Sequence, residues 1–572
     1  MRRALTLGSI MLLTGCLKSL PVETPEGSGI LGATPSESRL EADAEGEATT
    51  DDVTTPVVTT DTSGAPPRDA SGPTMTDVAP PLPDAEAPWP APDDVTESGD
   101  ASDSALAAPE DATPLPESSS VFLAVPVDPP LGSPVPVVVK ASADWSGPVS
   151  LSMNGVNHEL MVHRGRGSLT TTFTEEDDVL IAQGNGSAQP VSVTVTVRPE
   201  RQLTGLLGDT DLVWDAEADI RLDGVVTVPE GSQLMVTPGT RILLEANARL
   251  EIAGALSVTG PALFTRASEA AWGGLVVTPG GSASLDKAWF VGGGGDPSES
   301  FGHSNSQPVV KASLASMTLT GGGILDSPGK ALGGYKSTVT VTDFLISRCD
   351  TGGELVQSSL NASQLHVLEI PDADDEATDD DNDGLYVVGA LKVDDVVLGS
   401  SLTDVVFSHG EDDAIDHNDA ELSVTRAWIT GFRHEGIAAS GGRTLTVTDA
   451  VIQGCDQGIE AGYGDPEVIV RNALITNNRV GLRFGDAYSW SDDGLLDVSH
   501  TVSVQNSEAN VLNLTDTGEP KPDALVVSCS MVDDAAFDGQ DGNAPGIPSW
   551  QASGCVDAAP CDDSPVGPAL CD

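Results

Sequence analysis

Short apolar motifs recur at a nearly constant spacing in the second half of the chain, and this recurrence limits the possible folds more than any other feature. Four motifs end in Ile or Leu at steps of 22, 22 and 23 residues: 413–415, 435–437, 457–459 and 480–482. Two further apolar rows share this period: Ile429, Ile452 and Ile475, and Leu422, Leu445 and Val468. A self-similar period in this range is typical of solenoids.

Each repeat of about 22 residues has room for three short strands, because its apolar rows are β-rich and Gly, Asn and Asp separate them. The pattern predicts an all-β, right-handed parallel β-helix with three-strand coils stacked ~4.8 Å apart. Ile415, Ile437 and Ile459 should then form one interior column. We expect Gly436 and Gly458, which precede two of these residues, to adopt the positive φ that glycine tolerates.

The overall composition narrows the possible partners. The chain of 572 residues carries a formal charge of −60, and only 4% of its residues are aromatic. The length predicts several domains, and a thin solenoid filled with Ile, Val and Leu suits the shortage of aromatic residues. The charge repels nucleic acid and anionic membrane surfaces and attracts cations, Ca²⁺ above all.

The first residues form an export signal. Arg2 and Arg3 precede an apolar stretch over 4–13, which is too short to span a bilayer, and Leu-Thr-Gly-Cys16 follows. The motif resembles the bacterial lipoprotein signal. The resemblance implies removal of 1–15 and a lipid on Cys16. Because Leu17 follows, it also implies anchoring in the outer membrane, and we expect the chain at the cell surface. The alternative is an ordinary secretion signal with a chance cysteine.

The chain then divides by composition. The stretch 17–118 holds 22 Asp or Glu against three basic residues and lacks apolar periodicity, so we expect 16–118 to be a lipid-anchored, disordered tether. Seven short β runs with regular turns predict an Ig-like β-sandwich over 119–200. The β-helix should cover 201–530 in twelve to fourteen coils, with insertions at 291–307 and 371–384, and a cysteine-containing cap should cover 531–572.

The cysteines of an exported chain can form disulfides. We expect the pairs Cys529–Cys555 and Cys561–Cys571, although the sequence leaves the connectivity open. Cys349 and Cys455 should lie about five coils apart, too far for a bond, and we interpret them as buried thiols.

The early coils resemble a known group of surface proteins. The runs Val226 to Thr240, Leu250 to Gly260 and Trp272 to Leu275 are similar to the entry coils of bacterial cell-surface β-helix proteins of the pectin-lyase-like superfamily. The similarity is greatest to the β-helix region of CotH-type surface lipoproteins, and later turns such as 413–416 and 456–460 extend it over about 205–515. The resemblance implies the fold and says little about activity, and we expect no kinase-like domain.

Two acidic motifs are candidate sites. Asp379, Asp381 and Asp383 alternate before Gly384, as in the start of a calcium loop, but Ala390 stands where an EF-hand needs Glu. We predict either a Ca²⁺ turn of another type or a solvated acidic loop. The sequence therefore leaves two alternatives for a cofactor, Ca²⁺ or none.

The second motif joins Asp412, Asp413 and Asp416 to His434, which should lie one coil further on. The pattern is similar to polygalacturonases, in which a pair of aspartates precedes Gly-His-Gly and carboxyl groups act as acid and base. That family's substrate-binding cations are absent, because 460–462 reads Glu-Ala-Gly. The alternatives are hydrolysis, lyase chemistry or purely structural Asp turns.

The sequence thus favours a non-catalytic binding or adhesion module for carbohydrate or a cell-envelope polymer. The rival hypothesis is a polysaccharide hydrolase or lyase that uses the Asp/His cluster. We expect a monomer that binds no nucleic acid and contacts the membrane only through its lipid.

Overall fold

The computed structural model describes residues 121–546 except for 127, 154, 176–177, 184–190, 372–381, 487–492, 516–517 and 538–540. The chain divides into two units, Met1–Asp100 and Ala101–Asp572, and every described residue belongs to the second. The predicted signal, Cys16 and the tether therefore lie outside the described residues. Within them, no helix is long and apolar enough to cross a membrane.

Seven antiparallel strands form the predicted β-sandwich, in two sheets of order β1-β2-β5 and β4-β3-β6-β7. Val137, Leu151 and Val162 are fully buried between these sheets, because alternate residues of each strand point inward. The strands are β1 (Phe122–Ala124), β2 (Pro134–Lys140), β3 (Gly147–Met153), β4 (Val156–Val162), β5 (Arg166–Thr172), β6 (Asp178–Gln183) and β7 (Val191–Thr194).

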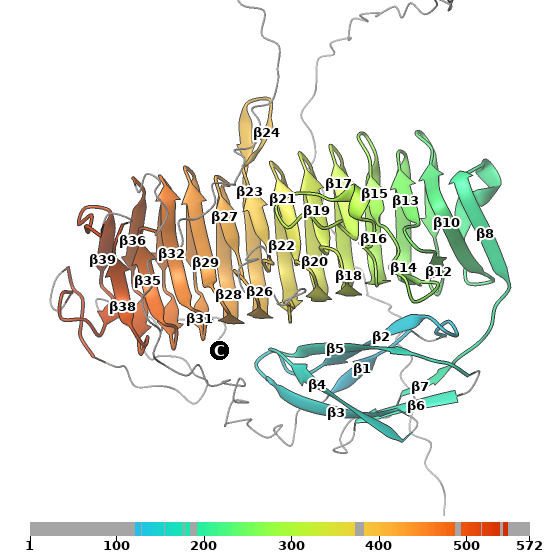
Figure 1. Ribbon diagram of the computed structural model, residues 1–572, viewed down its shortest axis with the longest axis horizontal. Helices are drawn as coiled ribbons and strands as arrows, with labels where there is room; N and C mark the ends of the chain where they lie inside the picture. The colour runs from blue at the N-terminus through green and yellow to red at the C-terminus, as the bar shows by residue number, and fades with distance from the viewer. Residues whose placement is uncertain are drawn as a thin grey trace, which may run out of the picture. The chain divides into compact units, whose positions relative to one another are not determined.

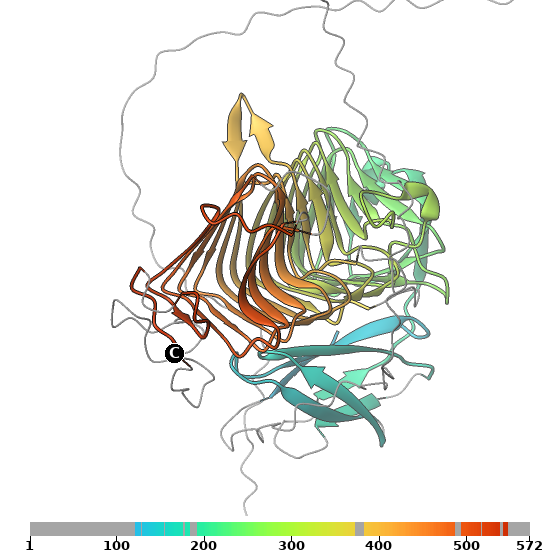
Figure 2. The same cartoon turned by 60° about the vertical axis from the view of Figure 1, so that its left-hand side comes forward.

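A parallel β-solenoid of about 12 turns follows, so the predicted fold class is confirmed. Figure 1 shows its strands stacked side by side, and Figure 2 shows the same coils obliquely along their axis. Each coil contributes to three parallel sheets. Sheet 1 contains β13 (Arg249–Ile252), β15 (Leu275–Val277), β17 (Val310–Ser313), β19 (Leu332–Tyr335), β21 (Gly353–Val356), β23 (Tyr386–Val388), β27 (Asp416–Asn418), β29 (Glu435–Gly441), β32 (Gln457–Gly464), β35 (Val480–Phe484) and β38 (Ala509–Asn513).

Long strands turn a corner from sheet 2 into sheet 3 in the central coils, and separate strands replace them in the later coils. The long strands are β14 (Ala255–Arg266), β16 (Ser282–Val291), β18 (Ser316–Ser327), β20 (Thr338–Cys349), β22 (Ser359–Leu368), β26 (Ser400–Gly410) and β28 (Leu422–Phe432). Later, sheet 2 contains β30 (Thr444–Thr448), β33 (Glu467–Arg471), β36 (Leu495–Ser499) and β39 (Leu525–Ser528), and sheet 3 contains β31 (Val451–Gln453), β34 (Leu474–Thr476), β37 (Val502–Val504) and β40 (Met531–Val532).

The first coils are built from β8 (Glu200–Leu206), β9 (Val213–Trp214), β10 (Asp219–Val228), β11 (Gln233–Val236) and β12 (Arg241–Leu244). Two 3-10 turns, η1 (Asp209–Asp211) and η2 (Pro297–Glu299), are the helical elements of the described residues.

The isoleucines of the repeat form interior columns, as predicted. Ile437 pairs with Ile459, and the pairing of Asp416 with Ala438 places Ile415 in the same row. All three side chains are fully buried in the solenoid core. Stacking them removes their apolar surface from water, which stabilises each coil against the next.

The glycines before these isoleucines have a different role from the predicted one. Gly436 and Gly458 are not among the glycines with positive φ, so the expected left-handed turn is wrong. A Cβ on Gly458 would lie 2.4 Å from the carbonyl oxygen of Gly481 and 2.5 Å from Cγ2 of Ile475. Glycine is needed here because the coils pass too close for a side chain.

The outer face of sheet 3 is apolar, and the sandwich packs against part of it. Leu325 and Leu345 point away from the solenoid interior yet are fully buried, in one cluster with Val138 of β2. Arg348 binds Asp326 at 2.6 Å and donates to the carbonyl oxygen of Ser168 at 3.0 Å. The sandwich therefore supplies the cover that this face requires.

Three insertions interrupt the coils. The first lies between β16 and β17 and contains η2, and the second falls between β22 and β23, partly outside the described residues. The third was not predicted: β24 (Leu391–Val393) and β25 (Val396–Leu398) form an antiparallel hairpin. Figures 1 and 2 show it standing away from the stacked coils.

The cysteines follow the prediction as far as they are described. Cys349 and Cys455 are buried free thiols, which confirms their interpretation. Cys529 is disulfide-bonded. Cys555, Cys561 and Cys571 lie outside the described residues, so both proposed pairings stay predictions.

Candidate functional site

One row of side chains on the outer face of sheet 1 follows directly from the repeat. The residue after each core Ile or Leu points outward, because side chains alternate along a strand. Strand register aligns these residues in one row: Tyr386, Asp416, Ala438, Glu460 and Arg483. A second row lies three residues earlier in each coil: Asp383, Asp413, Glu435 and Gln457. We call the outer face between Tyr386 and Arg483, with both rows, the acidic face.

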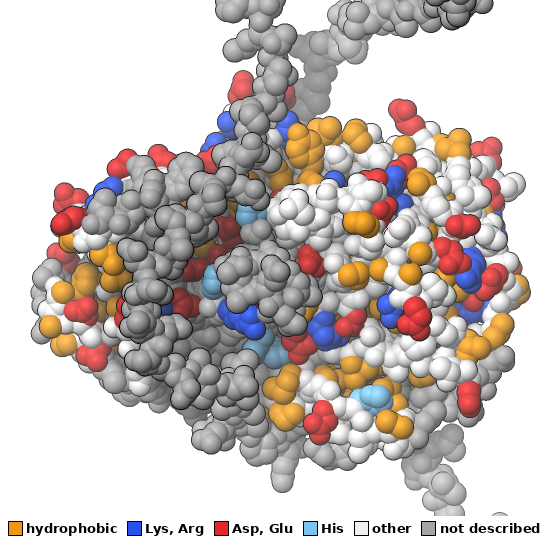
Figure 3. Space-filling model, in the orientation of Figure 1, with side chains coloured by type: hydrophobic (Ala, Val, Ile, Leu, Met, Phe, Trp, Pro, Cys, Tyr) orange, Lys and Arg blue, Asp and Glu red, His pale blue; other side chains and the backbone are white. Residues whose placement is uncertain are grey.

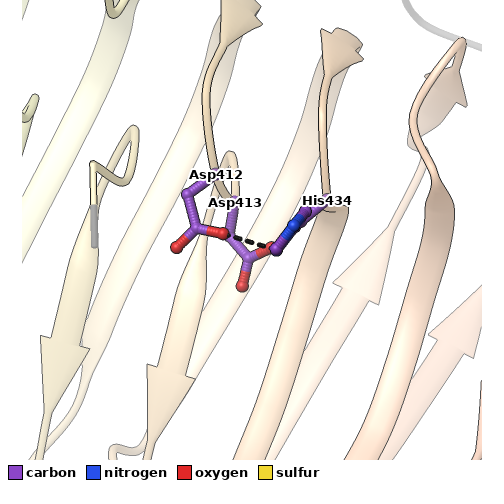
Figure 4. Close-up of side chains that lie close together, drawn as sticks. All are labelled: Asp412, Asp413 and His434. Carbon is purple, nitrogen blue, oxygen red and sulfur yellow. Dashed lines mark ion pairs between the residues drawn. The ribbon is translucent and has the colours of Figure 1, made fainter. Parts of the chain in front are cut away.

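The predicted Asp/His cluster is brought together at one corner of this face. Asp412, Asp413 and His434 each offer a ligand atom within 4.8 Å of the others, so these three could hold a divalent cation (Figure 4). Nδ1 of His434 lies 2.8 Å from Oδ1 of Asp412. The half-exposed His434 is thus the part of this cluster that a ligand can reach most easily.

Asp413 is the most enclosed member of the cluster. Its Oδ1 accepts a hydrogen bond of 2.7 Å from the backbone N–H of Glu435, which ties two coils together. Burial raises the pKa of Asp413 well above its usual range, and the neighbouring carboxylates of Glu435 and Asp412 raise it further. The enclosure of Asp413 and its hydrogen bond to the backbone of Glu435 give it a part in holding the two coils together.

Glu460 is a second carboxyl group with a strongly perturbed environment. It is 7% exposed, and its Oε2 lies 3.1 Å from Nη1 of Arg483. Burial raises the pKa of Glu460, Glu435 raises it further, and the positive charge of Arg483 opposes the shift. This arrangement favours a protonated Glu460 beside more exposed carboxylates.

Asp416 lies two coils from Glu460 in the same outward row, with Ala438 between them. Two strand spacings of ~4.8 Å separate their backbones by roughly 9.6 Å. Ala438, whose side chain is small, lies between them in this row. Of the four predicted catalytic residues, Asp416 is the one that lies on a strand of sheet 1.

Two tyrosines lie near Asp416. Nδ2 of Asn418 donates to the hydroxyl of Tyr386 at 3.3 Å and to that of Tyr463 at 3.4 Å. The two rings are half-buried, and Asn418 fixes their hydroxyls across several coils. We call Tyr386, Asn418 and Tyr463 the tyrosine platform, which offers apolar ring faces beside hydrogen-bonding groups.

The first insertion forms a wall beside the platform. The ring of His303 lies 5.6 Å from that of Tyr386, centroid to centroid. The backbone N–H of His303 donates to Oε2 of Glu354 at 2.9 Å, and Glu354 in turn binds the buried Lys330 at 2.6 Å. An insertion thus borders the candidate site, as expected for solenoids.

The predicted calcium turn is only partly described. Asp379 and Asp381 lie outside the described residues, while Asp383 is buried in the row that contains Asp413. The charge of Asp383 helps to raise the pKa of Asp413, so it belongs to the acidic face. A calcium ion held by all three aspartates stays a prediction.

Several residues of the face escaped the sequence reasoning. Glu460, Tyr386, Tyr463 and Arg483 were not assigned a role, although three of them directly follow a core position of the repeat. Extending the outward row from Asp416 along the period would have found Glu460 and Arg483. Tyr463 had no such signal, because β32 continues beyond its neighbours in sheet 1.

Charged side chains are unevenly distributed over the solenoid. In the view of Figure 3, acidic and histidine side chains lie next to one another on one part of the surface, whereas basic and acidic side chains alternate elsewhere. The described face contains more carboxyl groups than cations, and this imbalance is the main electrostatic feature of the site.

The sequence matches no family model and no curated protein. One solved structure with a similar arrangement is the catalytic unit of a thermostable GH87 alpha-1,3-glucanase from Streptomyces thermodiastaticus strain HF3-3. It is 11% identical, with a TM-score of 0.38, over 78% of this chain and 91% of that one. At this degree of likeness we draw nothing from the enzyme about the activity of the present chain.

Proposed function

We propose that this chain binds a polysaccharide across the acidic face of its solenoid. The observation that carries the proposal is the tyrosine platform: two ring faces, with hydroxyls held by Asn418, lie beside the carboxyl groups of Asp416 and Glu460. Sugars combine apolar C–H faces with many hydroxyls, and sites of this composition satisfy both. A flat sheet face also suits an extended polymer better than a compact ligand.

Binding should depend on the platform. The test is isothermal titration calorimetry with a panel of neutral and charged oligosaccharides, on the parent chain and on Tyr386→Ala and Tyr463→Ala. Each variant should weaken binding about three- to tenfold, since a well-placed aromatic contact contributes about 0.5–1.5 kcal/mol. Tyr335→Ala, on the same sheet but in β19, is the matched control and should leave binding unchanged. Equal losses in all three variants would reject the platform as the binding site.

A second candidate function is hydrolysis of the bound glycan, and one specific observation favours it. Inverting glycosidases hold their two carboxyl groups ~6.5–9.5 Å apart, with room for water between them. Asp416 and Glu460 stand two coils apart across Ala438. Glu460, with its raised pKa, would protonate the leaving oxygen, and Asp416 would activate the water.

Hydrolysis and binding separate in one experiment. Release of reducing ends from each oligosaccharide that binds is measured for the parent, Asp416→Asn and Glu460→Gln. A hydrolase should lose at least a hundredfold in rate in both variants while still binding substrate. Binding without product in the parent leaves the non-catalytic module, which the sequence favours.

We also propose the location that the export signal implies: a lipid on Cys16 that anchors the chain in the outer membrane, with the acidic tether between lipid and folded part. Radiolabelled palmitate should enter the parent chain and not Cys16→Ser. Labelling of both chains would contradict the anchor.

A further inference from the structure

The outward row of sheet 1 continues beyond the acidic face, toward the first coils. Tyr386 pairs with Glu354, Glu354 pairs with Gly333, and Gly333 pairs with Lys311. These residues occupy the same outward position as Asp416 on successive coils, which are ~4.8 Å apart. The length of a polymer bound along this row is therefore limited by what lies on the sheet and not by the sheet itself.

The first insertion lies on the earlier part of this row. The ring centroid of Phe301 is 4.0 Å from Nζ of Lys311, and the backbone N–H of His303 donates to Oε2 of Glu354 at 2.9 Å. Glu354 is 4% exposed although its strand position points outward, whereas Tyr386 on the next coil is partly exposed. The insertion thus covers the row as far as Glu354 and ends beside Tyr386.

Close contacts fix the insertion to the coils beneath it. Lys330 is fully buried, and its Nζ lies 2.6 Å from Oε2 of Glu354 and 5.6 Å from the ring centroid of Phe301. A Cβ on Gly302, whose φ is +74°, would overlap the carboxyl group of Glu354. Because breaking a buried ion pair is strongly destabilising, the insertion is a fixed part of this surface.

The insertion meets the tyrosine platform at a corner. The ring of His303 lies 5.6 Å from that of Tyr386, with an angle of 59° between the two planes. Tyr386 lies on the coil next to Glu354, and Tyr463 lies on β32, three coils further along the axis. A line of sugar rings over both tyrosines therefore follows the solenoid axis and meets the insertion at His303.

We infer that the acidic face binds the end of a polysaccharide chain, seated against His303, and not an interior segment. This inference rests on the proposed polysaccharide binding and narrows its substrate class to chain ends. A sugar over Tyr386 has the insertion on one side, where an interior unit would need its next neighbour. On the other side the row continues past Asp416, Ala438 and Glu460, along which further units can lie.

The number of protein molecules bound per polymer chain tests the inference without any substitution. The full chain is titrated by calorimetry with cellohexaose, laminarihexaose and the hexamers of N-acetylglucosamine and galacturonate. For each hexamer that binds, a long soluble chain of the same sugar follows. A site for chain ends takes one protein molecule per chain, whatever the length of that chain. Several molecules per long chain, in proportion to its length, would overturn the inference while the proposed function stands.

Two variants test the part of the insertion. Replacement of 296–306 by a short glycine linker opens the row from Lys311 to Glu354, so several molecules of this variant should bind per long chain. His303→Ala leaves the insertion in place and should weaken hexamer binding about threefold, because the terminal sugar loses one ring contact. His158→Ala, on β4 of the sandwich, is the matched control and should leave binding unchanged.

The remaining outcomes are distinct. One molecule per long chain in the linker variant as well, or equal hexamer affinities of the two histidine variants, would overturn the inference. If circular dichroism shows that the linker variant does not fold, the binding ratio of the parent and the affinity of His303→Ala decide by themselves. Failure of every hexamer and every longer chain to bind would reject the proposed function itself, and the inference with it.

Discussion

Replacement of Gly458 by alanine tests the close coil packing that the structure assigns to the glycines of the repeat. The new Cβ would lie 2.4 Å from the carbonyl oxygen of Gly481 and 2.5 Å from Cγ2 of Ile475. Neither neighbour can rotate away freely, because one is backbone and the other is a fully buried core side chain. The coils that contain β32 and β35 must therefore move apart locally.

The magnitude follows from two contributions. Overpacking a tight interior costs about 1–3 kcal/mol. Weakening one interstrand hydrogen bond between β32 and β35 adds about 1 kcal/mol. We therefore expect Gly458→Ala to lower the free energy of unfolding by about 2–4 kcal/mol.

The assay is urea denaturation followed by circular dichroism. The variant and the parent are compared with the same dependence of the free energy of unfolding on urea concentration. The matched control is Gly454→Ala, where a Cβ would meet nothing closer than 3.8 Å and only the φ of +68° is unfavourable. That control should lose about 1 kcal/mol. If Gly458→Ala costs no more than Gly454→Ala, the close-approach explanation is refuted.

Three further predictions follow from the described residues. Ile437→Ala should lower the free energy of unfolding by about 3–4 kcal/mol, because a fully buried side chain leaves a cavity between adjacent coils; a loss under 1 kcal/mol in the same urea assay would contradict the interior column. Asp413→Asn should become more stable relative to the parent as pH rises above about 4. Because the pKa of Asp413 is raised by folding, the folded parent binds more protons than the unfolded parent above this pH. The parent therefore loses stability as pH rises, whereas the variant has no carboxyl group at this position to titrate. Thermal unfolding from pH 4 to 8 checks this, and a difference that does not change with pH would reject it. Burial raises the pKa of Cys349 and Cys455 to about 12, so neither thiol should react with a thiol reagent at pH 8 until the chain unfolds, and rapid reaction in the folded state would contradict their burial.

The sequence predicted the architecture because one coil resembles the next. The period alone places Ile415, Ile437 and Ile459 in one column, and the seven β runs before it predict the sandwich strands. It also brought Asp413 and His434 together, since residues one period apart must lie on adjacent coils. These successes share one cause: stacking converts sequence spacing directly into spatial proximity.

The features that escaped prediction lie where an insertion breaks the repeat, or where one sequence pattern is compatible with two local conformations. The β24–β25 hairpin is an insertion that obeys local turn chemistry, and the period carries no information about it. Gly436 and Gly458 were assigned a positive φ because a glycine beside a turn is compatible with either a left-handed conformation or a close approach. The cover over Leu325 and Leu345 depends on contacts with the sandwich, which no local pattern records.

The electrostatics of the site also required the structure. Asp413 and Asp416 belong to one short motif, yet Asp413 is enclosed by carboxyl groups and Asp416 faces outward. Asp416 and Glu460 share one outward row with Ala438 between them, and only the strand register of the structure shows this. Sequence reasoning identified the region of the site, whereas the enclosure of Asp413 and the row shared by Asp416 and Glu460 became visible only in the structure.

A crystal structure of the chain with a bound oligosaccharide tests the central claim most directly. The account predicts sugar rings over Tyr386 and Tyr463, with the chain of sugars running along the solenoid axis past Asp416 and Glu460. An oligosaccharide bound to the sandwich, or to the outer face of sheet 2, would contradict it.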